Sequence, residues 1–210
     1  MGQDKKISAD KIIIAVILIA FILLVSVIYI TKRQGQLSLD GSYSLSYAST
    51  SSDGSDSSVK VTVSFDSSTG EYVETWNDSP FSTGTYTVND DRVVVTTDAT
   101  DTYDSEEIVY LLDGDVLVPE DYLYEGEIPD KDLFSAELIM DDGSQVTTVT
   151  FNEDGTFTVA VASDNTETSV SGTYERDGDY IKRTTDDGSS LTPFYLYQGN
   201  TLAGIAYTKD

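Results

Sequence analysis

The sequence predicts an all-β protein of two tandem antiparallel up-and-down meanders after one N-terminal transmembrane helix. Three observations predict this organisation: an internal repeat, many short runs in which apolar and polar residues alternate, and an uncharged apolar segment near the N-terminus. A meander of this size hides its edge strands best by curling into a small barrel or a two-layer roll. We therefore expect two small barrels or rolls behind a membrane anchor.

The internal repeat extends over some fifty positions, at a spacing of 85 to 88 residues. Phe65 corresponds to Phe151, and the sequence Ser-Thr-Gly-Thr-Tyr at 82–86 corresponds to Val-Ser-Gly-Thr-Tyr at 170–174. A repeat at fixed spacing indicates one supersecondary plan that is used twice.

The repeat divides the chain into four parts. Residues 1–33 are expected to form a cytoplasmic tail and a membrane anchor, 34–118 the first β repeat, 119–132 an acidic linker and 133–210 the second β repeat. The sequence leaves open whether the segment 119–132 is a linker or an ordered crossover. It also leaves open whether the two repeats share one core.

Each repeat reads as about seven short strands with small turns between them. Alternation is clearest in Val59–Phe65, and Asp113-Gly114 between two apolar runs predicts a tight hairpin. Residues 133–140 have the propensity of a helix, but they occupy the repeat position of 41–47, so we interpret them as a strand. The expected strands are 41–47, 59–65, 71–76, 85–88, 92–97, 107–112, 116–118, 133–140, 145–151, 156–162, 172–176, 180–184, 191–197 and 201–208.

The N-terminal segment Ile12–Ile30 has 19 residues without a charge. At ~1.5 Å per residue it is long enough to span a hydrocarbon core of about 30 Å. A cleaved signal peptide is the alternative, but the apolar run is longer than is usual for one and no small-x-small pair follows it. We expect an uncleaved signal anchor, with the short tail inside the cell and the large C-terminal domain outside.

Composition excludes several kinds of chemistry. The chain has no Cys and no His, which rules out disulfides, thiol nucleophiles, Cys/His zinc sites and a Ser-His-Asp triad. The chain has 12 basic and 37 acidic residues, and residues 1–33 hold five of the basic and two of the acidic ones. The remainder therefore carries 7 basic and 35 acidic side chains. Such a domain repels nucleic acid and anionic lipid. Its expected partners are cations, cationic peptides or neutral glycans, unless the acidic surface serves solubility alone.

The second repeat resembles the lipocalin-like domains of bacterial cell-surface proteins. The residues that carry this resemblance are Phe151, Gly155, Phe157, Ser171, Gly172, Thr173, Tyr174, Gly178, Asp179, Ile181 and the stretch 195–199. The first repeat matches more weakly, with Gly41-Ser-Tyr43 in place of the Gly-x-Trp that opens true lipocalins. The resemblance implies a small up-and-down barrel on an exported protein, and it supplies no catalytic residues.

Two groups of residues are candidate binding sites. Asp98, Asp101 and Asp104 recur every third residue in a polar stretch, and such oxygen ligands suit calcium. Solvated turn residues are the alternative reading of these aspartates. Trp76, the only tryptophan, and Tyr72 are the candidate ligand-binding residues, although a lone strand tryptophan is more often part of a core.

These observations predict a membrane-anchored extracellular protein with a non-catalytic role in surface binding or cell-envelope structure. The alternative is a lipocalin-like carrier of a small apolar ligand, and a carboxylate-dependent hydrolase is a distant third. Expected partners are the lipid bilayer, through Ile12–Ile30, and a cell-surface protein or glycan, but no nucleic acid. Calcium is the one cofactor that the acidic loops suggest.

Overall fold

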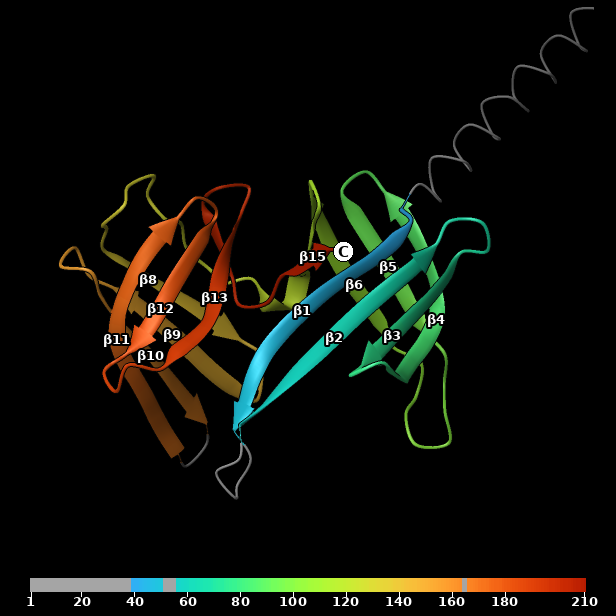
Figure 1. Ribbon diagram of the computed structural model, residues 1–210, viewed down its shortest axis with the longest axis horizontal. Coiled ribbons are helices and arrows are strands. Elements are labelled where there is room, and N and C mark those ends of the chain that lie inside the picture. Colours follow the sequence, from blue (N-terminus) through green and yellow to red (C-terminus); the bar gives the residue numbers. More distant parts are fainter. Residues whose placement is uncertain (1–38, 51–55, 164–165) are drawn as a thin grey trace, which may run out of the picture.

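The computed structural model describes residues 39–50, 56–163 and 166–210 (Figure 1). It confirms an all-β fold with two barrel-like sheets of antiparallel strands. The 3-10 turn η1 (Glu120–Tyr122) is the one helical element of the described residues, and none of these residues forms a helix long and apolar enough to cross a membrane. The predicted anchor Ile12–Ile30 lies outside the described residues.

The first barrel is closed, and seven of its eight strands follow one another along the chain. Its strands are β1 (Gly41–Thr50), β2 (Asp56–Asp66), β3 (Glu71–Trp76), β4 (Ser79–Asn89), β5 (Arg92–Thr97), β6 (Glu107–Asp113), β7 (Val116–Pro119) and β15 (Tyr207–Lys209). Consecutive strands pair as antiparallel hairpins, as the alternation in the sequence predicts.

The second sheet repeats this plan with seven strands in chain order. They are β8 (Ala136–Asp141), β9 (Gln145–Phe151), β10 (Thr156–Ser163), β11 (Thr166–Asp177), β12 (Tyr180–Thr185), β13 (Ser190–Tyr197) and β14 (Thr201–Ala203). The strand expected at 133–140 begins three residues later. The strand expected at 201–208 is divided into β14 and β15, because the chain leaves the second sheet after Ala203 and enters the first barrel.

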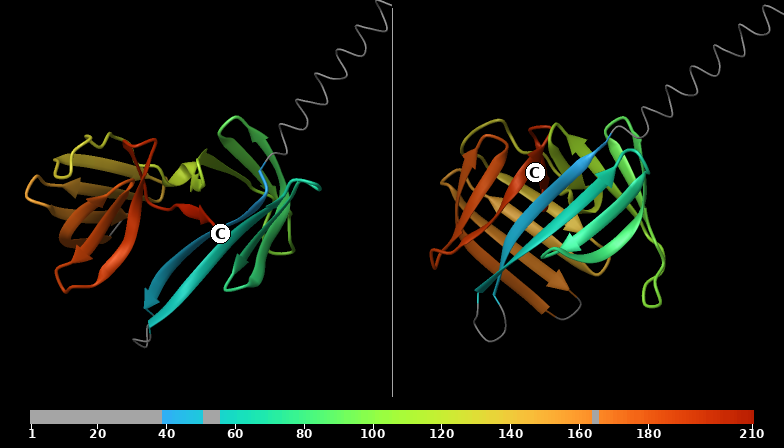
Figure 2. Two further views of the ribbon diagram at one scale, coloured as in Figure 1. Left: turned by 45° about the horizontal axis from the view of Figure 1, so that its top comes forward. Right: turned by 45° about the vertical axis from the view of Figure 1, so that its right-hand side comes forward.

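In each barrel a segment from the other half of the chain joins the two edge strands. In the first barrel, β15 lies between β1 and β7, and Tyr207 pairs with Leu117. In the second sheet, Leu123 bridges to Ala203 of β14 and Glu125 bridges to β8, so that the segment 123–125 lies between the two edge strands. Figure 2 shows the red C-terminal segment leaving the second barrel and ending as β15 in the first.

The barrels have separate cores and a third cluster between them. The first core is rich in tyrosine, and the second contains Phe134, Phe151, Phe157 and Phe194. Between the barrels, Leu111 and Val118 of the first pack with Tyr195, Tyr197 and Ala203 of the second. The hydroxyls of Tyr195 and Tyr197 donate hydrogen bonds to Asp113 and Asp91, at 3.1 Å each, across this contact.

The repeated Ser/Thr-Gly-Thr-Tyr motif has a structural cause in both barrels. A Cβ atom on Gly84 would lie 2.2 Å from the carbonyl oxygen of Thr96, and one on Gly172 would lie 2.0 Å from that of Thr184. The next strand therefore approaches too closely for any side chain. Two residues later, the buried hydroxyl of the motif tyrosine donates a hydrogen bond to the backbone just before the first strand of its repeat: Tyr86 to Leu39, and Tyr174 to Phe134.

Candidate ligand-binding site

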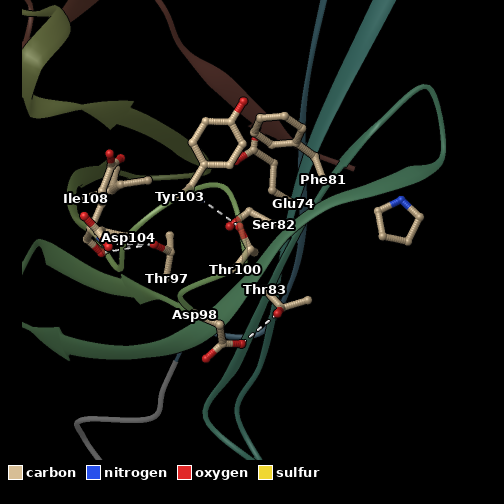
Figure 3. A pocket seen from close by; sticks show the side chains of 12 residues that line it. Glu74, Phe81, Ser82, Thr83, Thr97, Asp98, Thr100, Tyr103, Asp104 and Ile108 are labelled. Carbon is tan, nitrogen blue, oxygen red and sulfur yellow. Dashed lines mark hydrogen bonds between the residues drawn. The ribbon is translucent and has the colours of Figure 1, made fainter.

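A cavity of about 370 Å³ lies at one end of the first barrel, and we call it the mouth pocket (Figure 3). At this end β3 and β5 finish, β4 and β6 begin, and the loop 98–106 connects β5 to β6. Specific ligand pockets typically have volumes of about 300–1,000 Å³. The lining residues are Glu74, Pro80, Phe81, Ser82, Thr83, Thr97, Asp98, Thr100, Tyr103, Asp104, Glu106 and Ile108.

Beneath the mouth pocket the barrel is filled by tyrosine side chains. Tyr72 is fully buried, and its hydroxyl donates a hydrogen bond to Glu74 Oε2 at 3.1 Å and lies 3.3 Å from the hydroxyl of Tyr110. Burial raises the pKa of Tyr72 and raises the pKa of Tyr110 to about 12. Tyr72 is thus a core residue that meets the pocket only through Glu74, and not a pocket wall.

Trp76, the other predicted ligand residue, is 41% exposed and lies beside the mouth pocket. Its indole Nε1–H donates a hydrogen bond to Glu74 Oε1 at 2.6 Å, and its ring stacks on Phe81 with centroids 4.8 Å apart. Alternation places Tyr72, Glu74 and Trp76 on the same face of β3. Glu74 therefore connects the two predicted ligand residues, which do not themselves form one surface.

Phe81 and Tyr103 are pocket residues that the sequence reading missed. Phe81 is the extra residue of a β-bulge, since Glu74 pairs with Ser82 and Thr75 pairs with Pro80. Bulges redirect side chains, and this one leaves Phe81 58% exposed at the pocket. The Pro80-Phe81 pair in a polar stretch was the available signal. Tyr103 is 67% exposed and, like Phe81, lines the pocket.

The predicted calcium ligands are separated in the structure. Asp98 and Asp104 line the mouth pocket, whereas Asp101 is not among its lining residues. The carboxylate of Asp98 accepts a hydrogen bond from the Thr83 hydroxyl at 2.7 Å. Among the side chains that the structure describes, those of residues 39–47, 58–163 and 166–210, no three from His, Cys, Asp or Glu are placed to hold a metal ion.

Hydrogen bonds fix the loop 98–106 over the pocket. The Thr100 N–H donates to the Tyr103 carbonyl at 2.8 Å, and the Tyr103 N–H donates to the Thr100 hydroxyl at 3.0 Å. At the end of the loop, the Ser105 hydroxyl donates to the Thr97 carbonyl at 2.7 Å, and the Glu106 N–H donates to the Thr97 hydroxyl at 2.9 Å. These bonds hold the part of the loop that carries Tyr103 at the pocket.

In the described part of the second barrel, the positions equivalent to the mouth pocket differ from those of the first. Its β12–β13 connection, residues 186–189, is five residues shorter than the loop 98–106, and Val161 stands at the repeat position of Trp76. Arg183 takes the repeat position of Val95, and its guanidinium lies 3.5 Å from the centroid of the Phe194 ring. Burial lowers the pKa of Arg183 to about 10. The two repeats therefore share a fold but have diverged in chemistry.

The mouth pocket combines exposed aromatic rings with carboxylates, on a barrel whose interior is packed. This arrangement suits reversible binding of a small group at the surface. Comparison of the chain with protein-family models, with curated proteins and with solved structures finds no match.

Proposed function

We propose that this chain is a membrane-anchored extracellular protein that binds a ligand at the mouth pocket without catalysing a reaction. The observation that carries the proposal is the gathering of three exposed aromatic side chains, Trp76, Phe81 and Tyr103, around one cavity. Large exposed apolar groups that cluster on a soluble surface usually mark a binding site. Aromatic rings are effective there because they supply large contact areas in fixed geometry.

The polar groups of the pocket support binding better than catalysis. The chain has no His or Cys to serve as a base or a nucleophile. Both carboxylate oxygens of Glu74 accept hydrogen bonds, from Tyr72 and from Trp76, which fix the carboxylate in one orientation. A fixed carboxylate is a suitable acceptor or counter-charge for a bound group.

The proposed anchor is the uncharged segment Ile12–Ile30, which places the two barrels outside the cell. Eight of its nineteen residues are isoleucine, and basic residues flank it on both sides. The antiparallel meanders and the Ser/Thr-Gly-Thr-Tyr motif also support the proposal that both units are lipocalin-like.

A carrier of a small apolar ligand is the second candidate. Pro80, Phe81, Tyr103 and Ile108 give the mouth pocket an apolar side. However, Tyr43, Phe65 and other aromatic residues fill the barrel interior, so that a ligand would rest at the mouth and not be enclosed. Surface binding is therefore the better supported of the two.

The fluorescence of Trp76 provides the test, because this residue is the only tryptophan and lies beside the pocket. The full-length chain in non-ionic detergent would be titrated with three probes: benzyl alcohol, methyl β-glucoside and choline. We expect a saturable change with at least one probe, weakened in Phe81→Ala but retained in Val170→Ala, which truncates an exposed side chain of the second barrel. The absence of a saturable change with all three probes would overturn the proposal, as would equal binding by Phe81→Ala.

A further inference from the structure

We propose that the mouth pocket recognises a small organic cation through its ammonium group. This inference rests on the binding function proposed above and names the chemical class of the ligand. It follows from three properties of the pocket: the charge of its lining, the neutral partners of its carboxylates and the exposed faces of its aromatic rings.

The lining of the mouth pocket carries four carboxylates and no basic side chain. The carboxylates are those of Glu74, Asp98, Asp104 and Glu106. Glu74 comes from β3 and the other three come from the loop 98–106, so the fold brings Glu74 to charges that are distant from it in the chain. Acidic groups that line a concave surface attract and concentrate cations.

The hydrogen bonds to these carboxylates leave their charge uncompensated. Glu74 accepts from a phenol and an indole, and Asp98 accepts from a threonine hydroxyl, all of which are neutral donors. The three basic side chains of the first barrel lie away from the pocket lining, and Nζ of one of them, Lys209, lies 5.9 Å from the centroid of the Tyr43 ring. Lys60 lies 3.8 Å from Asp210, and Arg92 forms two 2.7 Å hydrogen bonds with Glu120. A cationic ligand would supply the missing counter-charge.

The aromatic rings favour an organic cation over a metal ion. The face of an aromatic ring attracts an ammonium group and also contacts the methyl groups that a quaternary ammonium carries. Phe81 and Tyr103 present such rings at the pocket, and the Trp76 ring stacks on that of Phe81. Calcium instead requires six to eight oxygen ligands. In the part of the chain that the structure describes, no three carboxylates gather for that purpose.

A pair of isosteric probes separates charge from shape. Choline and 3,3-dimethyl-1-butanol have nearly the same size, but only choline has a positive nitrogen. Both would be titrated against the full-length chain in non-ionic detergent, with Trp76 fluorescence and calorimetry as readouts. We expect choline to bind about tenfold or more tightly than the alcohol. Equal affinities would overturn the cation inference and leave the binding function standing, whereas no response to these or to the neutral probes above would overturn both.

Two substitutions distinguish a role of charge from a role of local structure. Asp98→Asn removes one charge but keeps an oxygen that accepts from Thr83, and Thr83→Val removes that hydrogen bond but keeps the charge. We expect Asp98→Asn to weaken the binding of choline several-fold without altering the binding of 3,3-dimethyl-1-butanol. Thr83→Val should weaken the binding of choline less than Asp98→Asn does. The matched control is Asp187→Asn, because Asp187 also accepts from a threonine hydroxyl but lies in the second barrel. Equal losses in Asp98→Asn and Asp187→Asn would indicate non-specific attraction to an acidic protein and overturn the inference.

Discussion

Tyr124 and Tyr207 occupy equivalent places in the two barrels, and each comes from the other half of the chain. Tyr207 pairs with Leu117 in the first barrel, and the Tyr124 N–H donates a 2.9 Å hydrogen bond to the Leu202 carbonyl in the second. Leu117 and Leu202 are equivalent in the repeat, 85 residues apart. Both tyrosines are buried in the cores that they complete. The two repeats have therefore exchanged their closing segments, β15 and residues 123–125, within one chain.

This exchange predicts that the two halves of the chain bind each other when they are separated. Residues 1–132 and 133–210, coexpressed as two polypeptides, are expected to copurify because each supplies the segment that joins the edge strands of the other's barrel. Tyr207→Ala removes a buried aromatic side chain from β15, a change that typically costs about 3–5 kcal/mol, and should weaken the association strongly. Tyr122→Ala, at a 42% exposed tyrosine, serves as the control. Halves that purify apart as folded monomers would contradict the exchange.

Replacement of the motif glycines is expected to destabilise each barrel. In Gly84→Ala and Gly172→Ala the new methyl group would meet a backbone oxygen of the adjacent strand at 2.2 and 2.0 Å. The strands must then separate, and we expect a loss of about 1–3 kcal/mol or more in the free energy of unfolding, measured with urea. In Gly204→Ala the nearest atom would be a ring carbon of Tyr124 at 3.4 Å, so this control should cost less.

The first barrel is expected to lose stability at alkaline pH. Burial raises the pKa values of Tyr72 and Tyr207, and raises that of Tyr110 from 10.0 to about 12. A raised pKa means that the folded state disfavours tyrosinate. The stabilisation is therefore complete below pH 10 and is lost as the pH rises through about 12. For Tyr110 alone, the contribution to the free energy of unfolding that is lost at high pH is about 3 kcal/mol. Urea unfolding of Tyr110→Phe across this range should show a weaker pH dependence than wild type, whereas Tyr122→Phe should follow wild type.

Calcium is expected to stabilise the protein no more than magnesium does. The net charge of −25 makes the folded chain repel itself, and any salt screens this repulsion. A specific site would add about 2.7 kcal/mol at a hundredfold excess over its Kd. Thermal melting in calcium chloride, magnesium chloride and sodium chloride at equal ionic strength measures the difference. A rise in melting temperature that occurs with calcium chloride alone would indicate that Asp98, Asp101 and Asp104 do form a metal site.

Local signals in the sequence predicted most of the fold. Alternation located the strands, and Asp113-Gly114 marked the β6–β7 turn, where Gly114 has a φ of 60°. By contrast, the exchange of β15 and the segment 123–125 depends on which sheet edge each short strand meets. The alternation of apolar and polar residues in β15 and in the segment 123–125 is compatible with either barrel, so the placement of these two segments was not predictable.

The candidate site was only partly predictable for the same reason. Trp76, Asp98 and Asp104 were identified from the sequence and lie at or beside the mouth pocket, whereas Tyr72 belongs to the core and Asp101 lies apart from the lining. The position of Phe81 at the pocket depends on a β-bulge, and that of Tyr103 depends on how the loop 98–106 folds. Neither position can be predicted from the residue type.

The sequence by itself determined the β class, the repeat and the acidic surface, because these depend on alternation, turn residues and composition, which are local properties. Only the tertiary structure decided that the barrels close each other and that Glu74, Phe81 and Tyr103 meet at one pocket. Such contacts join residues far apart in the chain, and their free energy is gained only once the strands have paired.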